Sequence, residues 1–153
     1  MIFLKSYFVN TTPEIDFLSI MADVKYAIRD AQAKNGLVSV HIPGPAAAVT
    51  VFEPLPELIE ELKIAFETFA SEAAQGKDKR KEDVFIAPRV QAALIGRSLS
   101  MPLKGGSVLI APYEEIFLID FDKKSGRREY YVSIVAEDQA PPPKQQQQQQ
   151  RKK

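Results

Sequence analysis

The sequence contains no cysteine and no tryptophan, and its 153 residues include a single histidine, His41. Without cysteine there can be no disulfide, no thiolate metal site and no cysteine nucleophile. One histidine is too few for a metal site built from several imidazole ligands. These absences exclude zinc sites with nitrogen and sulfur ligands, and they exclude cysteine-based catalysis.

A net charge of either sign is also lacking, because 20 lysine and arginine residues balance 20 aspartate and glutamate residues. A neutral chain has no overall field that attracts nucleic acid, a membrane surface or an acidic substrate. The composition therefore predicts no membrane partner and argues against nucleic acid.

Long apolar runs are absent as well. No segment approaches the roughly 20 apolar residues that a membrane-spanning helix needs. The N-terminal segment lacks the basic start, the apolar core and the small-residue cleavage site of a signal peptide. By elimination, we expect a cytoplasmic location.

What the sequence does contain is typical of a globular domain, with 45% hydrophobic and 26% charged residues. The length suits one domain with a sizeable core, which we place at residues 1–138. From residue 139 the composition changes to a proline run, six glutamines and a basic end. Such a segment has almost nothing apolar to bury, so we expect residues 139–153 to be a disordered tail.

Two main helices are expected from apolar residues at three- and four-residue spacing. The first covers residues 19–33, with Ser19 as its N-cap and Asn35-Gly36 as its left-handed stop. The second, longer helix follows Pro56 and ends near residue 76. We expect its apolar side to pack on the sheet of the same domain rather than on a partner.

Strands are expected where apolar and polar residues alternate, or where short apolar runs lie between turns. Residues 76–83 form a charged loop, residues 88–94 a short helix closed by Gly96, and Gly105-Gly106 a hairpin turn. Two main helices among about seven strands predict an α+β fold: a two-layer domain with its helices on a largely antiparallel sheet. The expected strands begin at Ile2 and then cover residues 38–42, 49–51, 99–103, 108–110, 116–121 and 130–135.

The loop between the second and third of these strands carries the most specific pattern, Ile-Pro-Gly-Pro-Ala-Ala-Ala-Val-Thr at residues 42–50. Pro43 at the start of this loop and Ala-Ala-Val at residues 47–49 resemble an active-site loop of the YjbQ-like family. That family loop reads Pro-His-Thr-Thr-Ala-Ala-Ile/Val. The His-Thr-Thr positions hold Gly44, Pro45 and Ala46 here. None of these three side chains can transfer a proton, bind a metal or attack an electrophile.

The resemblance to this family extends over most of the domain, from about Val24 to Val135. Glu53 matches the acidic residue that closes the strand after the loop, and residues 91–96, 98–102 and 116–122 resemble further family segments in the same order. The family is linked to a secondary thiamine-phosphate synthase activity. Its members generally form homotrimers with pockets near subunit contacts. The resemblance therefore implies a YjbQ-like α+β fold and a homo-oligomer, a trimer.

The departures from the family pattern gather where its chemistry would be. Two further histidine positions hold Ala87 and Arg89, and a lysine position holds Gln91. The family's Gly-Thr-Trp-Gln-Gly becomes Ala-Pro-Tyr-Glu-Glu at residues 111–115. We therefore predict that the chain keeps the scaffold, has lost the family's catalytic residues, needs no cofactor or metal, and acts as a ligand-binding or structural protein.

An alternative is an active enzyme of the thiamine-phosphate synthase type, or of a related anion-handling chemistry, that uses Glu53, Arg89 and Glu114. The resemblance would bring these three side chains near one pocket, where Arg89 could bind a small anionic ligand. A simpler interpretation is that Arg89 forms an ion pair with one of the two carboxylates. The candidate pocket of this chain comprises Gly44, Ala46, Glu53, Arg89, Gln91 and Glu114.

Two weaker interpretations remain. His41 lies on the polar phase of its strand, where a surface histidine is more common than a catalytic one. The basic segments at residues 77–81, 123–128 and 151–153 could bind nucleic acid weakly. Acidic residues interrupt or flank the first two, however, and no aromatic stripe accompanies them, so we interpret these two as solvated loops.

Overall fold

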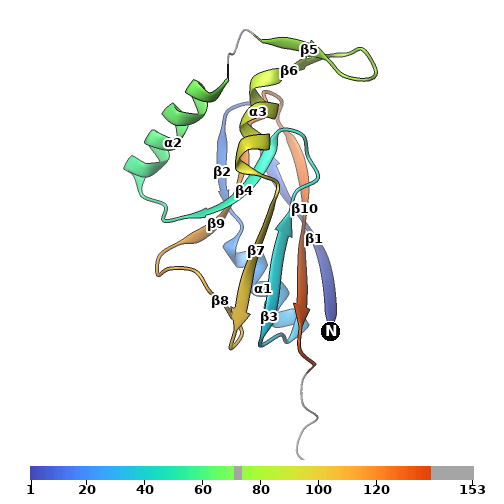
Figure 1. Ribbon diagram of the computed structural model, residues 1–153, viewed down its shortest axis with the longest axis vertical. Coiled ribbons are helices and arrows are strands. Elements are labelled where there is room, and N and C mark those ends of the chain that lie inside the picture. The colour runs from blue at the N-terminus through green and yellow to red at the C-terminus, as the bar shows by residue number, and fades with distance from the viewer. Residues whose placement is uncertain (71–73, 139–153) are drawn as a thin grey trace, which may run out of the picture.

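A computed structural model of the chain describes residues 1–70 and 74–138. In these residues three helices pack on antiparallel sheets, as Figure 1 shows, and the predicted α+β class is confirmed. The expected tail at 139–153 lies outside the described residues. The elements are β1 (Ile2–Thr11), β2 (Asp16–Ser19), α1 (Met21–Ala31), β3 (Gly36–His41), β4 (Ala47–Phe52), α2 (Pro56–Phe69), β5 (Gln75–Lys77), β6 (Asp83–Phe85), α3 (Ile86–Ile95), β7 (Ser98–Lys104), β8 (Ser107–Val108), β9 (Glu115–Asp120) and β10 (Gly126–Ala136).

Two sheets build the body of the domain. The larger has the strand order β1-β10-β3-β7-β8, and the smaller has the order β2-β9-β4. β5 and β6 form a separate hairpin. Every strand pair is antiparallel. The core between the sheets forms where the inward residues of β3 and β10, such as Val40 and Val132, meet α1.

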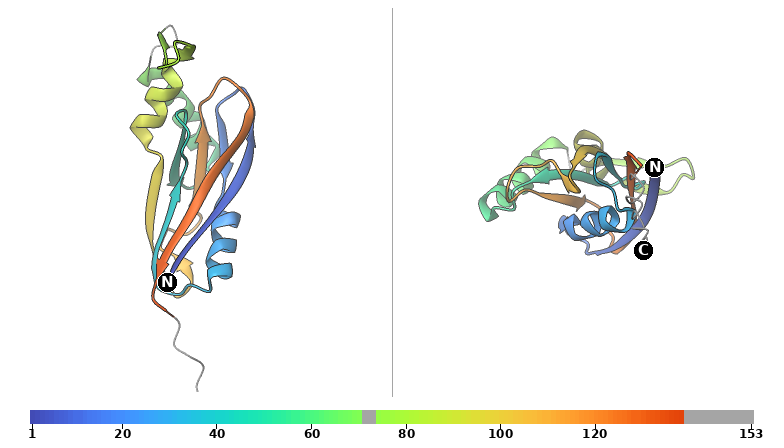
Figure 2. Two further views of the ribbon diagram at one scale, coloured as in Figure 1. Left: turned by 90° about the vertical axis from the view of Figure 1, so that its right-hand side faces the viewer. Right: turned by 90° about the horizontal axis from the view of Figure 1, so that it is seen from below.

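β9 lies between two hydrophobic clusters, because its successive side chains point to opposite faces of the small sheet. Ile116 and Leu118 pack into the main core with α1 and the large sheet. Phe117 and Ile119 pack on the other side, against α2 and α3. In Figure 2, α1 lies on one side of the molecule, and α2 and α3 lie on the opposite side, near one end.

The outer face of the large sheet remains exposed, and we call it the open face. Ile2, Leu4, Leu37 and Val135 lie on it with 82%, 65%, 52% and 52% of their surface accessible. Ile2 pairs with Val135, and Val135 pairs with Leu37, so three of these side chains form one row across neighbouring strands. The next rows carry hydroxyl groups, including a Ser39–Ser100 hydrogen bond with 2.6 Å between the Oγ atoms.

Several element boundaries differ from the sequence-based expectation. Ser19 does not cap α1, because it belongs to β2 and its Oγ donates to Glu115 Oε1 at 2.8 Å. α1 ends at Ala31, and its C-cap Gln32 adopts the left-handed conformation, ahead of the predicted stop at Asn35-Gly36. α2 ends at Phe69, and the expected loop at 76–83 is part of the β5–β6 hairpin, which extends from Gln75 to Phe85.

The apolar side of α2 is only partly covered. Phe66 is the one buried residue that the helix contributes, while Leu58, Ile59 and Leu62 are partly buried against the second cluster. Phe69 remains 51% exposed. The prediction of packing on the domain's own sheet therefore holds for one side of the helix. Residues 71–73, which the prediction also placed in this helix, lie outside the described residues.

Among the described helices, none is sufficiently long and apolar to cross a membrane.

Candidate functional site

The loop at residues 43–46 connects β3 to β4 and is fixed at both ends by backbone hydrogen bonds. Ile42 N donates to Arg97 O at 2.9 Å, just before the loop. Phe121 N donates to Ala46 O at 2.8 Å, at its far end. The loop is therefore held between the residues that follow α3 and the residues that follow β9.

Two concave regions flank this loop, and Pro45 lines both. We call the first the arginine hollow; its volume is about 440 Å³. We call the second the Asp120 cavity; its volume is about 100 Å³. The arginine hollow is lined by Pro45, Arg89, Ala92, Ala93, Gly96 and Arg97. The Asp120 cavity is lined by Gly44, Pro45, Ala46, Ala47, Asp120, Asp122 and Arg128.

Among the described residues, the arginine hollow is lined by two arginines and by no acidic residue. Arg89 Nη1 donates to Phe85 O at 3.2 Å, one turn back along α3. Arg97 Nη1 donates to Gly44 O, also at 3.2 Å. Neither arginine forms an ion pair with a carboxylate of the described residues. Since a guanidinium has five N–H donors, each retains donors for a ligand.

The Asp120 cavity contains a buried acidic group. The Asp120 side chain is 1% exposed, and its Oδ1 accepts from Arg128 Nε at 3.3 Å. Arg128 Nη2 also approaches Asp122 Oδ2 at 3.4 Å and donates to Lys124 O at 2.6 Å. Asp120 Oδ2 has no hydrogen-bond partner among the described residues. Burial raises the pKa of the Asp120 carboxyl, and this desolvation outweighs the opposing effect of Arg128.

The predicted pocket residues lie in several places. Gly44 and Ala46 line the Asp120 cavity, and Arg89 lines the arginine hollow. Glu53 and Glu114 meet in a third hollow of about 470 Å³, together with Lys25 and Tyr113.

Gln91 is buried and faces α2. Its Nε2 donates to Phe66 O at 2.8 Å, so it links α3 to α2. Within the described chain, Arg89 forms no ion pair with Glu53 or Glu114. Gly44 and Ala46 therefore line the Asp120 cavity, Glu53 and Glu114 line the third hollow, and Arg89 lines the arginine hollow.

His41 lies on the open face. Its Nδ1 is 2.5 Å from Ser98 Oγ on the neighbouring strand. This agrees with the expectation of a surface histidine.

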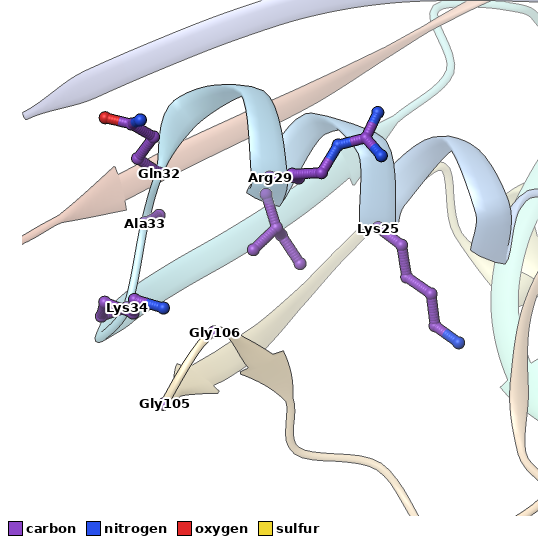
Figure 3. Close-up of a pocket in the computed structure, with 8 residues that line it drawn as sticks. Lys25, Arg29, Gln32, Ala33, Lys34, Gly105 and Gly106 are labelled. Carbon is purple, nitrogen blue, oxygen red and sulfur yellow. The ribbon is translucent and has the colours of Figure 1, made fainter.

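The predicted hairpin turn at Gly105-Gly106 is confirmed between β7 and β8. It borders a hollow of about 470 Å³ beside the end of α1. In Figure 3, Lys25 and Lys34 stand at opposite ends of this hollow, while the guanidinium of Arg29 points away from the glycines. Arg29 instead lies 4.8 Å from the Tyr26 ring centre. The cations therefore do not converge on one ligand position.

The charged loops contain their own counter-ions. Lys77 Nζ is 2.9 Å from Asp83 Oδ1, and Arg80 lies within 4 Å of Asp78 and Glu82. Arg128 is engaged with Asp120 and Asp122. This pairing supports the interpretation of solvated loops over a nucleic-acid surface.

In the part of the chain that the structure describes, no three histidine or acidic residues come together in a way that could hold a metal ion.

Four residues of these hollows were missed by the sequence analysis: Arg97, Asp120, Asp122 and Arg128. Asp120 carried a signal, because it occupies the same inward phase as Ile116 and Leu118 in an apolar strand. A carboxylate at such a position indicates a buried polar site. Arg97 carried no comparable signal, since only the fold brings it to Gly44.

The architecture and the loop define a class: α+β domains in which a curled antiparallel sheet and three helices surround a loop that joins two strands. The chain belongs to the YjbQ-like family, because the family model described as UPF0047 protein YjbQ-like matches residues 5–137. The resemblance inferred from the sequence is therefore confirmed.

Individual relatives share the family at low identity. UPF0047 protein MJ1081 of Methanocaldococcus jannaschii is 23% identical over 131 residues, which cover 86% of this chain and 93% of that protein. A YbjQ-like protein of Sulfolobus solfataricus has a similar structure, with a TM-score of 0.79, 18% identity, and coverage of 90% and 99% of the two chains. Hypothetical protein APE1520 of Aeropyrum pernix gives a TM-score of 0.76 at 22% identity, covering 88% and 98%. These structural likenesses establish the fold.

Proposed function

We propose that this chain is a YjbQ-like protein that keeps the family scaffold, has lost the family-type catalytic site, and binds a small anionic ligand in the arginine hollow. The observation that carries the proposal is the pair of guanidinium groups of Arg89 and Arg97, which lie beside the loop and lack carboxylate partners among the described residues. Arginine is suited to carboxylate and phosphate groups because its planar donors can bind two oxygens at once.

Loss of the family chemistry is supported by three positions. Gly44, Ala87 and Arg89 stand where the resemblance expects histidines. Gly44 and Ala87 offer no titratable group, and Ala87 is only 5% exposed. The guanidinium of Arg89 carries only N–H donors and no acceptor, so it cannot serve as a general base.

The charge of the arginine hollow favours an anion. The hollow lies at the C-terminal end of α3, where Gly96 N caps Ala92 O. The helix dipole contributes about −0.5 charge at that end, against about +2 from the two arginines. The balance of about +1.5 remains available to a ligand. Its attraction is weakened by salt because Arg97 is exposed.

Inorganic phosphate and pyrophosphate are suitable probes. We expect calorimetric or NMR titration to give a phosphate dissociation constant on the order of 1 mM, with pyrophosphate binding more tightly because it carries more charge. Arg97→Ala should weaken binding about 10-fold, or about 1.4 kcal/mol. Arg80→Ala, which removes an exposed arginine in the β5–β6 hairpin, is the matched control. Equal affinity of all three proteins would contradict the proposal.

Loss of catalysis has its own test. We expect purified protein, given the pyrimidine diphosphate and thiazole phosphate substrates of thiamine-phosphate synthases, to form no thiamine phosphate above a no-protein blank. Turnover that Arg89→Ala abolishes would show an active enzyme instead.

An enzyme that uses Glu53 and Glu114 is the second candidate, and it is supported by their shared hollow with Lys25 and Tyr113. Two carboxyl groups in one hollow can act as acid and base if their surroundings separate their pKa values. Turnover lost in Glu53→Gln but retained in Arg89→Ala would favour this alternative.

We also propose a cytoplasmic homotrimer that assembles through the open face. The accessible row of Ile2, Leu37 and Val135 supports a contact of this kind, since exposed apolar rows of this sort mark interaction surfaces. The three side chains are uncharged, so they bring no charge into a subunit contact that would need a partner.

A further inference from the structure

The Asp120 cavity is bordered by the same contacts that fix the loop. Ala47 of β4 pairs with Asp120 of β9, and Phe121 N donates to Ala46 O. The apolar part of the lining comes from Pro45, Ala46 and Ala47. A volume of about 100 Å³ corresponds to about three water molecules at roughly 30 Å³ each. The cavity therefore has room for a group of about three heavy atoms.

One oxygen of the Asp120 carboxylate lacks a hydrogen-bond partner there. Its side chain is 1% exposed and lines the cavity, and its Oδ2 has no hydrogen-bond partner among the described residues. A buried carboxylate oxygen without a partner costs free energy, so such an atom in a cavity indicates a donor from a ligand.

The net charge of the side chains around the cavity indicates which kind of hydrogen-bond donor fits there. Two carboxylates, Asp120 and Asp122, and one guanidinium, Arg128, sum to −2 + 1 = −1 when both acids are ionised. A single positive charge makes the cluster neutral, whereas an anion would be repelled by the unpaired oxygen. A divalent metal would overcompensate, and the described residues offer it no third acidic or histidine ligand.

We infer that the Asp120 cavity binds one monovalent cationic hydrogen-bond donor, the alkylammonium or amidinium end of a small molecule, which donates to Asp120 Oδ2. The alkyl or planar part of this group packs against Pro45, Ala46 and Ala47. Arg128, which also pairs with Asp122, holds the carboxylate of Asp120 in place through Oδ1. This site is separate from the arginine hollow and does not depend on anion binding there.

Methylammonium and guanidinium chloride are the probes, with sodium acetate and sodium chloride as controls of size and ionic strength. In amide NMR spectra of the full chain, we expect saturable shifts at Gly44, Ala46 and Ala47 with one or both cationic probes, and none with the controls. Asp120→Asn should weaken binding at least 10-fold, because it removes the charge with little change of shape. Asp83→Asn, at an exposed carboxylate of the β5–β6 hairpin, should leave binding unchanged.

A second measurement uses the unmodified chain and therefore does not depend on how the variant folds. The Asp120 carboxyl carbon is titrated by NMR with and without methylammonium. Because the bound cation favours the ionised acid, methylammonium should lower the pKa of Asp120 and bind more weakly as the pH falls through it. A cavity that holds water only would give no saturable shift and no change in this titration.

The inference is overturned if neither cationic probe binds, if acetate binds equally well, or if Asp120→Asn binds the cations with unchanged affinity. Phosphate titration of the same samples separates the two proposals. Phosphate binding without methylammonium binding overturns this inference alone, and the reverse result overturns the anion proposal alone.

Discussion

Asp120 makes the stability of the fold depend on pH. Its raised pKa means that the folded state holds this proton more tightly than the unfolded chain does. The contribution of Asp120 to the stability of the folded state is fully present below the pKa of the unfolded chain, about 3.9. It is lost as the pH rises through the higher pKa of the folded state.

Asp120→Asn should remove this dependence. We expect the free energy of unfolding of the natural chain, relative to the variant, to fall as the pH rises from about 4 to 7. Urea denaturation at several pH values measures the difference.

Asp78→Asn is the control with the opposite sign. Backbone hydrogen bonds, first from Glu82, lower the pKa of Asp78, so its contribution is lost as the pH falls. If the two variants gave the same slope with pH, the assignment of a buried, desolvated acid at Asp120 would be wrong.

At the scale of single residues, the sequence predicted the loop but not the whole of its surroundings. Gly44 and Ala46 do line a cavity, and Arg89 does line a hollow beside the same loop. The partners, Arg97 and Asp120, come from segments 53 and 76 residues beyond Gly44. Only the pairing of β4 with β9 and the path of the chain after α3 bring them together.

Among the elements, β3 begins at a position that only glycine suits. Gly36 has φ of +156°, and an added Cβ would overlap the carbonyl oxygen of Val135 and approach Ala136 Cα within 2.6 Å. The obstacle is backbone of the paired strand β10, which cannot move aside without disturbing the sheet.

Gly36→Ala should therefore destabilise the domain by roughly 2–4 kcal/mol, which thermal or chemical denaturation would detect. Gly105→Ala is the matched control in the β7–β8 turn. Its φ is +58°, but nothing lies within 4 Å of an added Cβ. It should cost only the roughly 1–2 kcal/mol of a left-handed residue. A smaller loss at Gly36 than at Gly105 would contradict the close approach.

Elements with clear periodicity were predictable, and short ones were not. The alternation in β1 and β3 appears in the structure, and so does the apolar stripe of α1, with Val24 and Ile28 in the helix and Ile20 at its N-cap. The three-residue strands β5 and β6 are too short to show a period, so the segment looked like a loop. Ser19 was assigned to a cap because its pairing with Phe117 in β9 is a long-range contact.

For the whole molecule, the open face sets the expected assembly. Leu37→Asp would place a charge at one end of the apolar row, next to Val135. If the chain is a trimer through this face, the variant should elute as a monomer, because burying an unpaired carboxylate costs several kcal/mol.

Light scattering after size exclusion measures the mass directly. Ile64→Asp, at an equally exposed apolar residue on α2, should keep the trimer. A natural chain that is monomeric at micromolar concentration, or a Leu37 variant that remains trimeric, would contradict assembly through the open face.

The position of β9 between the two hydrophobic clusters has a consequence for cooperativity. Opening either cluster exposes one side of this strand, so the two cores should melt together as one unit. α2, with Phe66 as its buried anchor, lies at the edge of that unit and can detach at lower free energy. The loop beside the arginine hollow is hydrogen-bonded to Phe121, which directly follows β9. We therefore expect the loop to lose its structure when the whole domain unfolds, and not when α2 detaches.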